Sequence, residues 1–223
     1  MTALRVASYN VRYFRDDKAA AARVVRAIGP DVLCLQEVPR WIRARTKIGA
    51  FARDCGLSWS GGHWGSGGTT ILTSPRVRLV DIGHHRLPVL PRTEPRGFTL
   101  ATVAVPGAAP LAVAGVHLSL NRLERTRHVA LVLDAAPAHL PFILAGDVNE
   151  ESDGAAWGWL AEHLRWVTPP TPTFPARAPR RTIDAVFASP SLRVAPRTEV
   201  VLNRDDLFAA TDHLPVWADF ELA

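Results

Sequence analysis

Cysteine is scarce in this chain, with only Cys34 and Cys55 among 223 residues. Cys34 lies inside an apolar run and Cys55 at the end of a helix-like segment, and neither has the nearby partners of a metal site. Two cysteines cannot build the disulfide framework of a small secreted domain. We therefore interpret both as reduced thiols and expect a cytoplasmic protein.

Long apolar runs are missing as well. No run approaches the roughly 20 apolar residues that are needed to cross a bilayer. The first residues lead directly into the strand-like LRVASYN, without a basic segment followed by an apolar one. The sequence therefore predicts no transmembrane segment and no secretory leader.

Lysine is almost absent, because only Lys18 and Lys47 occur, and arginine carries nearly all of the basic charge. The net charge of +5 suits a polyanionic partner such as nucleic acid or another phosphate compound. An arginine bias together with much alanine and proline also arises from coding composition. The charge therefore favours a phosphate-bearing partner without identifying it.

The chain is long enough to bury one substantial core, and its 48% hydrophobic and 21% charged content is ordinary for a globular protein. The segment 168–181 holds five prolines and is irregular, which makes it the one candidate domain boundary. The strands predicted after it are too few for a second domain. We therefore predict a single domain over residues 1–223.

Helical and strand patterns are interleaved along the chain. Helices are predicted over residues 16–29, 39–55, 121–136 and 153–164. Strands include residues 4–10, 31–38 and 142–145 and, late in the chain, 182–188, 198–203 and 212–222. Because βα units are mixed with successive strands, neither a doubly wound parallel sheet nor a pure β-sandwich fits.

The stretch PFILAGDVNE, residues 141–150, shows an unusual feature of these strands. Four large apolar residues are followed by Ala145-Gly146, after which Asp147 and Asn149 stand two residues apart. Side chains two apart in a strand point to the same side. Both polar groups are thus expected at one place, which is either a turn or a reaction centre.

Similar polar residues occur at the ends of other apolar strands. Taken one at a time, each has an ordinary structural explanation, such as an Asx-turn at Asp147. Together they bring four carboxylates and two imidazoles into one cluster, which repels itself unless it holds a cation. An oxygen-rich ligand set favours Mg²⁺ or Mn²⁺ over zinc. These residues are Asn10, Glu37, His117, Asp147, Asn149, Asp184, Asp212 and His213.

At this point the chain resembles a known family. The segments SYNVR, LQEV, GVHLSL, AGDVN, RTIDAVFAS and TDHLPV are similar, in order, to the signatures of the endonuclease/exonuclease/phosphatase superfamily, which includes deoxyribonuclease I. They run from residue 8 to residue 216. The resemblance implies an α/β (α+β) four-layer sandwich, in which two packed mixed β-sheets are flanked by helices. It also implies hydrolysis of phosphate esters with a divalent metal.

The resemblance assigns three residues to the metal and two to the attacking water and the phosphate. Glu37 is expected to be the main metal ligand, with Asp212 nearby and Asn10 holding the metal shell or a phosphate oxygen. Asp147 is expected to orient or deprotonate water. Asn149 is expected to donate to a non-bridging phosphate oxygen.

The remaining assignments concern the imidazoles and the arginines. His213 is expected to contact the phosphate or assist proton transfer, with Asp184 fixing its ring. His117 matches the second imidazole of the deoxyribonuclease branch and is expected to polarise the phosphate or protonate the leaving oxygen. Arg96 lies where family members often have a phosphate-binding arginine and is expected to bind the substrate phosphate. Arg181 is close to Asp184 in the sequence, so we expect it to line the cleft and bind the phosphate as well.

The sequence favours a nuclease-like phosphodiesterase acting on a single strand or an accessible end, because we find no separate DNA-binding module or long inserted loop. A phosphomonoesterase or an inositol or lipid phosphatase is the alternative enzyme. A non-catalytic module that binds a phosphate ligand is the alternative from another class. We expect a monomer. Among the seven tryptophans, Trp64, in a glycine-rich loop, is the one whose setting suggests base stacking.

Overall fold

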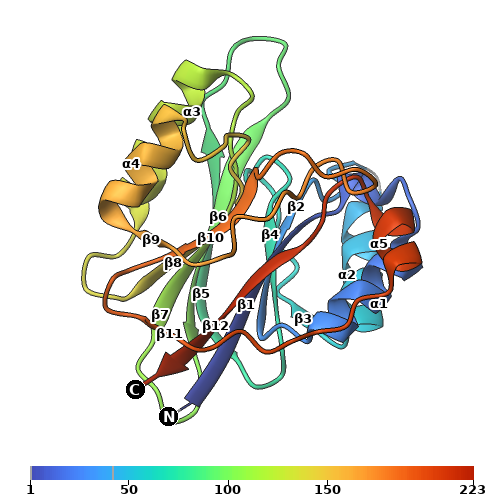
Figure 1. Cartoon of the computed structure of the whole chain (residues 1–223), viewed down its shortest axis with the longest axis horizontal. Helices are drawn as coiled ribbons and strands as arrows, with labels where there is room; N and C mark the ends of the chain where they lie inside the picture. The colour runs from blue at the N-terminus through green and yellow to red at the C-terminus, as the bar shows by residue number, and fades with distance from the viewer. Residues whose placement is uncertain (1, 42) are drawn as a thin grey trace.

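Two mixed β-sheets lie face to face in the computed structural model, which describes residues 2–41 and 43–223 (Figure 1). The first sheet has the order β11-β12-β1-β2-β4-β3. Its strands are Arg193–Val194, Val216–Leu222, Thr2–Asn10, Val32–Gln36, Thr70–Thr73 and Ser58–Trp59. The second sheet has the order β5-β6-β7-β8-β10-β9. Its strands are Arg78–Leu87, Arg96–Ala104, Leu111–His117, Phe142–Asp147, Asp184–Ala188 and Arg165–Trp166.

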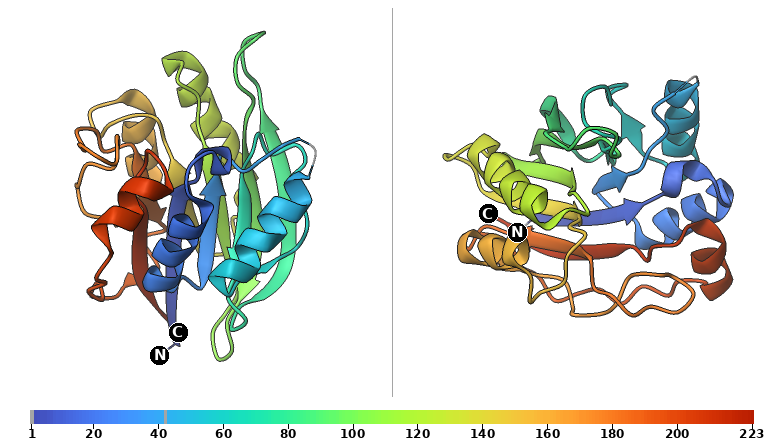
Figure 2. Two further views of the ribbon diagram at one scale, coloured as in Figure 1. Left: turned by 90° about the vertical axis from the view of Figure 1, so that its right-hand side faces the viewer. Right: turned by 90° about the horizontal axis from the view of Figure 1, so that it is seen from above.

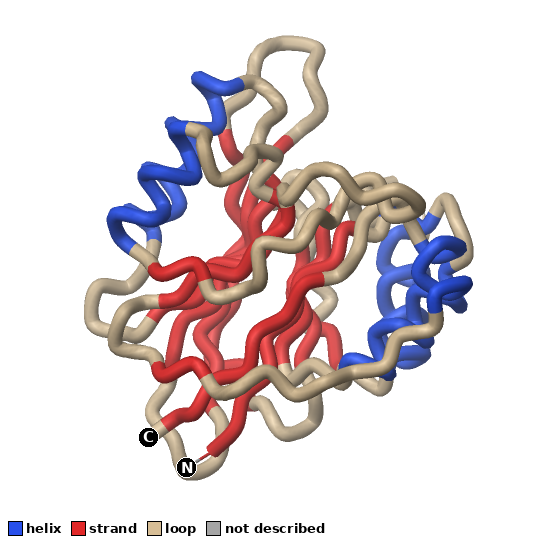
Figure 3. The backbone as a smooth tube through the Cα atoms, in the orientation of Figure 1, coloured by secondary structure: helices blue, strands red, loops and turns tan. Residues whose placement is uncertain are grey.

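Helices form the two outer layers, and Figures 2 and 3 show them on opposite sides of the paired sheets. The first sheet is covered by α1 (Lys18–Ile28), α2 (Ala44–Cys55) and α5 (Arg204–Ala210). The second is covered by α3 (Arg122–Ala135) and α4 (Ala155–His163). This confirms the predicted four-layer sandwich. Every helix in residues 2–41 and 43–223 is too short or too polar to cross a membrane.

Three apolar layers hold these four layers together. Residues from both sheets, such as Val6, Val113 and Val186, fill the space between the sheets. Helix α1 packs Val25 and Ile28 on the outer face of the first sheet. Because the central strands are buried on both faces, they are continuous apolar runs rather than alternating ones. Each fully buried aliphatic side chain contributes about 1.5–3 kcal/mol to folding.

Helix α1 shows how the sequence fixes an element locally. The Asp17 side chain caps the helix by accepting hydrogen bonds from the backbone N–H groups of Ala19 and Ala20. Gly29 ends it in the left-handed conformation with φ of 61°, and Pro30 follows. The predicted helix over residues 16–29 is confirmed in position.

Two other sequence predictions differ from the structure. The helix predicted from residue 39 begins only at Ala44, after Arg43 with φ of 64°; Ile42 lies outside the described residues. The strand predicted at 198–203 is wrong, and helix α5 follows the segment directly. β1 pairs with one edge of β12, and the two-residue β11 pairs with the other edge only at Phe220 and Glu221. Residues 198–203 do not continue that pairing, and Thr198 instead donates its N–H to the Asp219 side chain. Asn203 then caps α5 by accepting from the N–H groups of Asp205 and Asp206.

Gly146 is required by a close approach between β7 and β8. A Cβ atom at this position would lie 2.1 Å from the carbonyl oxygen of Val116. We therefore expect Gly146→Ala to destabilise the protein by about 1–3 kcal/mol, and to lower the melting temperature by several degrees. Thermal unfolding followed by circular dichroism measures this.

Gly158 provides the matched control. It lies on the exposed side of α4, and a Cβ atom there would have no neighbour within 4 Å. Gly158→Ala is expected to stabilise the helix by roughly 0.5–1 kcal/mol. A Gly146→Ala variant as stable as Gly158→Ala would contradict the close packing of β7 against β8.

Candidate active site

The polar strand ends meet at one end of the two sheets, opposite the end that holds the first residues of β1 and the last of β12 (Figure 1). Strand β1 runs parallel to β2, so Asn10 pairs with Gln36, the residue before Glu37. Strand β7 runs parallel to β8 and places His117 beside Asp147. Because the carboxyl ends of parallel strands meet at the same edge, the fold gathers these groups.

Asp147 lies at the centre of the cluster and is 1% exposed. Its Oδ1 accepts a hydrogen bond of 2.9 Å from the backbone N–H of Asn149, which is an Asx-turn. Its Oδ2 accepts one of 3.1 Å from Asn10 Nδ2 and lies 3.4 Å from His117 Nε2. The carboxylate therefore both shapes the turn and faces the polar cluster. Burial, and then the charge of Asp184, raise its pKa.

Glu37 and Asn10 form the more open side of the cluster. Asn10 Nδ2 also donates to Glu37 Oε1 at 3.2 Å, so one amide joins the two carboxylates. The Glu37 side chain is 22% exposed, whereas that of Asp147 is 2% exposed. Glu37 has φ of 52°, a conformation that non-glycine residues adopt rarely and mostly where the surroundings impose it. The side-chain oxygen Oδ1 of Asn10 accepts a hydrogen bond from the backbone N–H of Arg12, which fixes the orientation of the Asn10 amide.

His213 is held between two buried carboxylates. Its Nδ1 lies 2.9 Å from Asp184 Oδ2, and its Nε2 lies 3.9 Å from Asp147 Oδ2. The hydroxyl of Thr173 donates to the same Asp184 oxygen at 2.6 Å. Burial alone lowers the pKa of His213, but the charge of Asp184 and its hydrogen bond outweigh it and raise the pKa to about 10. Asp184 therefore both orients the His213 ring and favours its protonated form.

Asp184 reaches this place through strand pairing. It lies directly opposite Asp147 in the antiparallel pair of β10 and β8. The sequence analysis did not single out Thr173, since nothing in the proline-containing run marks that threonine among its neighbours. The loop returns here because Thr173 and Phe174 pair with Arg181.

His117 differs from His213 in the direction in which its surroundings shift its pKa. It is buried, with Nε2 3.4 Å from Asp147 Oδ2 and 4.0 Å from Glu37 Oε1. Burial, followed by the charges of Arg96 and His213, lowers its pKa well below the usual value. The surroundings thus shift the pKa values of the two imidazoles in opposite directions. Nδ1 of His117 is buried without a partner among the described residues.

Asn149 follows Asp147 closely in space as well as in sequence. It has φ of 56°, and its Nδ2 donates to the backbone oxygen of Leu118 at 3.0 Å. An amide nitrogen carries two hydrogens, so one N–H remains for the predicted bond to a phosphate oxygen. The residue is 8% exposed, which puts it at the edge of the cluster.

The predicted phosphate-binding arginines lie in different settings. Arg96 begins β6, is 7% exposed, and makes no ion pair among the described residues. A buried guanidinium without a carboxylate suits an incoming anion. Arg181 is half exposed, with its Nε 3.6 Å from Glu151, so the structure does not bring it against the carboxylate cluster.

Asp212, which was predicted near the metal, lies at the rim. Its carboxylate pairs with Arg12 Nε at 3.4 Å and is 34% exposed. Its negative charge is among those that raise the pKa of His213. The structure therefore brings Asn10, Glu37, His117, Asp147, Asn149, Asp184 and His213 together, and places Asp212 and Arg181 further out.

The donor set fits a hard divalent cation. Among residues 2–41 and 43–223, Asp184 Oδ1 is buried without a partner, and burial, followed by the negative charge of Asp184, raises the pKa of Asp147. One ligand atom each from Asp147, Asp184 and His213 lie within 4.8 Å of one another. However, a protonated His213 cannot bind a cation. The carboxylate oxygens of Asp147 and the more open Glu37 are the better ligands by this chemistry.

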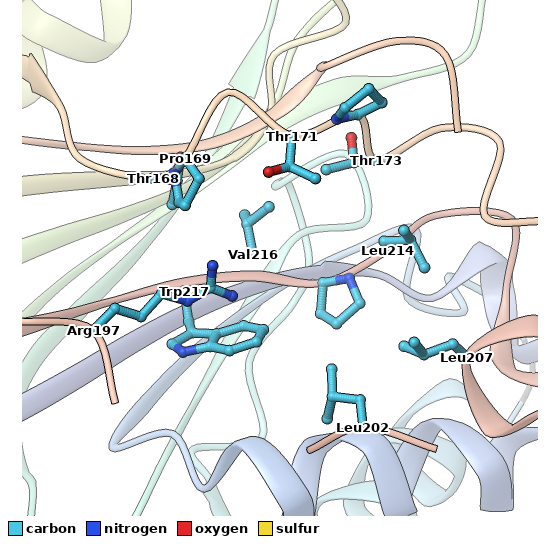
Figure 4. A pocket seen from close by; sticks show the side chains of 12 residues that line it. Thr168, Pro169, Thr171, Thr173, Arg197, Leu202, Leu207, Leu214, Val216 and Trp217 are labelled. Atoms are coloured by element: carbon cyan, nitrogen blue, oxygen red, sulfur yellow. The ribbon is translucent and has the colours of Figure 1, made fainter. Parts of the chain in front are cut away.

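A separate cavity of about 180 Å³ lies next to the cluster, between the proline-rich loop and β12 (Figure 4). Thr171 and Thr173 approach it from the loop, and Trp217 lies on the opposite wall. Thr173 links the two places, since its hydroxyl binds Asp184. Apart from Arg197, which lies over the Trp217 ring, the other wall residues are mostly apolar.

The fold and the cluster of carboxylates, amide and imidazoles define a hydrolase of phosphate esters. Residues 7–213 match the profile of the Endonuclease/Exonuclease/phosphatase family, and the chain belongs to that family. The resemblance found in the sequence is thereby confirmed. A comparison with curated proteins gave no match.

Three solved structures illustrate the likeness. An endonuclease/exonuclease/phosphatase from Beutenbergia cavernae shares 24% identity, with a TM-score of 0.76 over 100% of this chain and 72% of its own. One from Bacteroides vulgatus shares 17% identity, with a TM-score of 0.80 over 100% of both chains. A mannosyl-6-phosphatase from Bacteroides thetaiotaomicron shares 18% identity, with a TM-score of 0.76 over 98% of this chain and 100% of its own. At these identities the structures establish the fold.

Proposed function

We propose that the protein is a divalent-metal-dependent phosphodiesterase of nuclease type. The observation that carries the proposal is the position of Asp147, which lies within 4 Å of both imidazoles and accepts from the amide that also binds Glu37. A carboxylate of raised pKa next to a protonated histidine supplies a base and an acid in one site.

Each step of the proposed hydrolysis has a residue that can accept a proton, donate a proton or bind a phosphate oxygen. Water attacks phosphorus and passes its proton to Asp147 as the bond to the leaving oxygen breaks. The His213 imidazolium balances the charge on the phosphate and gives its Nε2 proton to the leaving oxygen. Neutral His117 donates an N–H, and Asn149 and Arg96 bind non-bridging oxygens.

Glu37, supported by Asn10 and with Asp147 and Asp212 nearby, would hold Mg²⁺ or Mn²⁺. When bound, such an ion neutralises charge on the phosphate and lowers the pKa of water. In this assignment the ion would be held by the more exposed Glu37, and the hydrogen bond between His213 and Asp184 would be kept.

A phosphomonoesterase is the second candidate, and it is favoured by one observation. The mannosyl-6-phosphatase of Bacteroides thetaiotaomicron has the same fold, so the fold itself accommodates a monoester. The diester is favoured here because a monoester carries one more negative charge, and the cluster already contains several carboxylates. Family membership and the complete cluster favour either enzyme over a non-catalytic binding module.

Turnover of bis(p-nitrophenyl) phosphate and of p-nitrophenyl phosphate tests the proposal. We expect the diester to be hydrolysed at least about tenfold faster with Mg²⁺ or Mn²⁺ than with EDTA, and faster than the monoester. Faster turnover of the monoester would favour the second candidate. Equal rates with metal and with EDTA would contradict the metal requirement.

A further inference from the structure

Two tryptophans on the surface near Glu37 are unusually exposed. Trp41 is 73% exposed and Trp64 is 70% exposed, whereas Trp157 is 2% exposed in the core. Large aromatic side chains are normally mostly buried, and an exposed group of them often marks a binding site. Neither residue has a role in the hydrolysis described above.

Each exposed indole ring packs against one neighbouring side chain. The Arg40 guanidinium lies 5.3 Å from the centre of the Trp41 ring and pairs with Glu94 at 2.7 Å. His63, which is 2% exposed, lies 5.2 Å from Trp64, measured between ring centres. Both ring nitrogens of His63 are buried without a partner among the described residues, and its ring lines the cavity beneath Trp64. His63 therefore supports the exposed Trp64 ring from inside the protein.

Positive charge surrounds the two rings. Trp41 and Trp64 line two adjoining cavities together with Arg40, Arg43, Arg45 and Arg86, and no acidic residue lines either cavity in the described part of the chain. Of these four arginines, only Arg40 has an ion-pair partner within residues 2–41 and 43–223. Arg43, Arg45 and Arg86, which have no ion-pair partner among the described residues, line the same cavities as the two indoles. Such a lining suits a ligand that carries both phosphates and flat rings.

This surface is continuous with the active site. Arg40 and Trp41 follow Glu37 by three and four residues. The N–H of Val38 donates to the oxygen of Gly68, which ties the Trp64 loop to the segment that carries Glu37. Gly67 lies so close to the backbone of Arg96 that a Cβ atom would be 2.3 Å away. A chain that extends from the phosphate site therefore meets the two tryptophans.

We infer that Arg40, Trp41, Trp64 and Arg86, the basic aromatic rim, bind single-stranded nucleic acid beside the scissile phosphate. The inference rests on the proposed function and names its substrate class. Unpaired bases can stack on exposed indoles, but the bases of a duplex are already stacked on each other. A membrane surface is disfavoured because the rings line cavities among arginines and do not form a continuous apolar patch.

Fluorescence anisotropy of a labelled oligonucleotide of about 12 nucleotides tests the inference, in EDTA so that no hydrolysis intervenes. Trp41→Ala and Trp64→Ala are each expected to weaken single-strand binding by roughly 5- to 100-fold. Arg86→Ala is expected to weaken binding and to lower the slope of log K against log salt by ~0.7.

Matched controls exist in the chain. Arg78 begins the strand that carries Arg86 near its other end, and Val201 is 89% exposed far along the sequence from the rim. Arg78→Ala and Val201→Ala are expected to bind the oligonucleotide as the unaltered protein does. The same strand annealed to its complement, and vesicles of phosphatidylcholine and phosphatidylserine, complete the set of probes.

The outcomes separate the alternatives. Equal binding of the single strand by the tryptophan variants and the unaltered protein would overturn the inference, as would tighter binding of the duplex. Tryptophan-dependent binding to vesicles but not to the oligonucleotide would also overturn it, in favour of a membrane surface. If the protein hydrolysed the small diester but bound the oligonucleotide without dependence on the tryptophans, the inference about the rim would be wrong and the proposed phosphodiesterase would stand. Tryptophan-dependent binding without hydrolysis would support the rim and reject the proposed phosphodiesterase.

Discussion

Replacing Asp147 by alanine is expected to lower the rate of diester hydrolysis by about 10²–10⁴-fold, the usual loss when a general base is removed. The carboxylate is the only group that joins Asn10 and both imidazoles among the described residues. The fold should remain, because an ionised carboxylate whose pKa is raised by burial and by Asp184 costs stability in the folded state. Turnover of bis(p-nitrophenyl) phosphate and far-UV circular dichroism measure the two effects.

Asp153 supplies the control for this substitution. It is an exposed carboxylate in the loop that follows β8, so Asp153→Ala changes the charge near the site without touching the cluster. Its turnover should match that of the unaltered protein. If Asp147→Ala retained near-normal turnover, the assignment of the base would be wrong.

Replacing His213 by alanine is expected to lower the rate of diester hydrolysis by about 10²–10⁴-fold as well. The substitution removes both a positive charge at the phosphate and the proton for the leaving oxygen. The exposed His139 gives the control, since His139→Ala removes an imidazole outside the cluster. A His213→Ala variant that hydrolyses the diester at the rate of His139→Ala would contradict the role.

Asp184→Asn tests the same assignment through the pKa. Asp184 raises the pKa of His213 to about 10, so the imidazole keeps its proton far above neutrality in the unaltered protein. Without that charge the pKa falls, and His213 loses its proton at lower pH. The alkaline limb of the pH–rate profile should therefore move to lower pH. A purely structural role for Asp184 would lower the rate without moving the limb.

Much of the site could be predicted from strand ends. Each polar residue follows or begins an apolar run, and the two-residue spacing of Asp147 and Asn149 correctly places both at one edge. The turn is confirmed for Asp147, since one carboxylate oxygen forms the Asx-turn. The other oxygen faces the polar cluster, and its role in a reaction stays a prediction. The sequence could not show which carboxylate is open to a ligand. The two differ in exposure, since the Glu37 side chain is partly exposed and that of Asp147 is buried.

The failures share one physical cause. Residues 198–203 alternate like a strand, but a strand forms only where another offers free hydrogen-bonding groups. Beside β12, Thr198 donates its N–H to the Asp219 side chain and not to a backbone oxygen, so the segment does not extend the sheet beyond β11. Trp41 fell inside a predicted helix, and its exposure follows from the later start of α2. In each case the local pattern did not decide the observed structure.

The sequence by itself determined the alternation of apolar strands and helices, the caps of α1, and which chemical groups stand at the strand ends. These features depend on residues a few positions apart, so local sterics and hydrogen bonding specify them. Only the tertiary structure decided that Asn10 joins Glu37 to Asp147 across 137 residues, that Asp184 faces Asp147, and that Trp41 and Trp64 share a cavity. Such contacts depend on sheet pairing and packing between distant segments, which a local pattern does not encode.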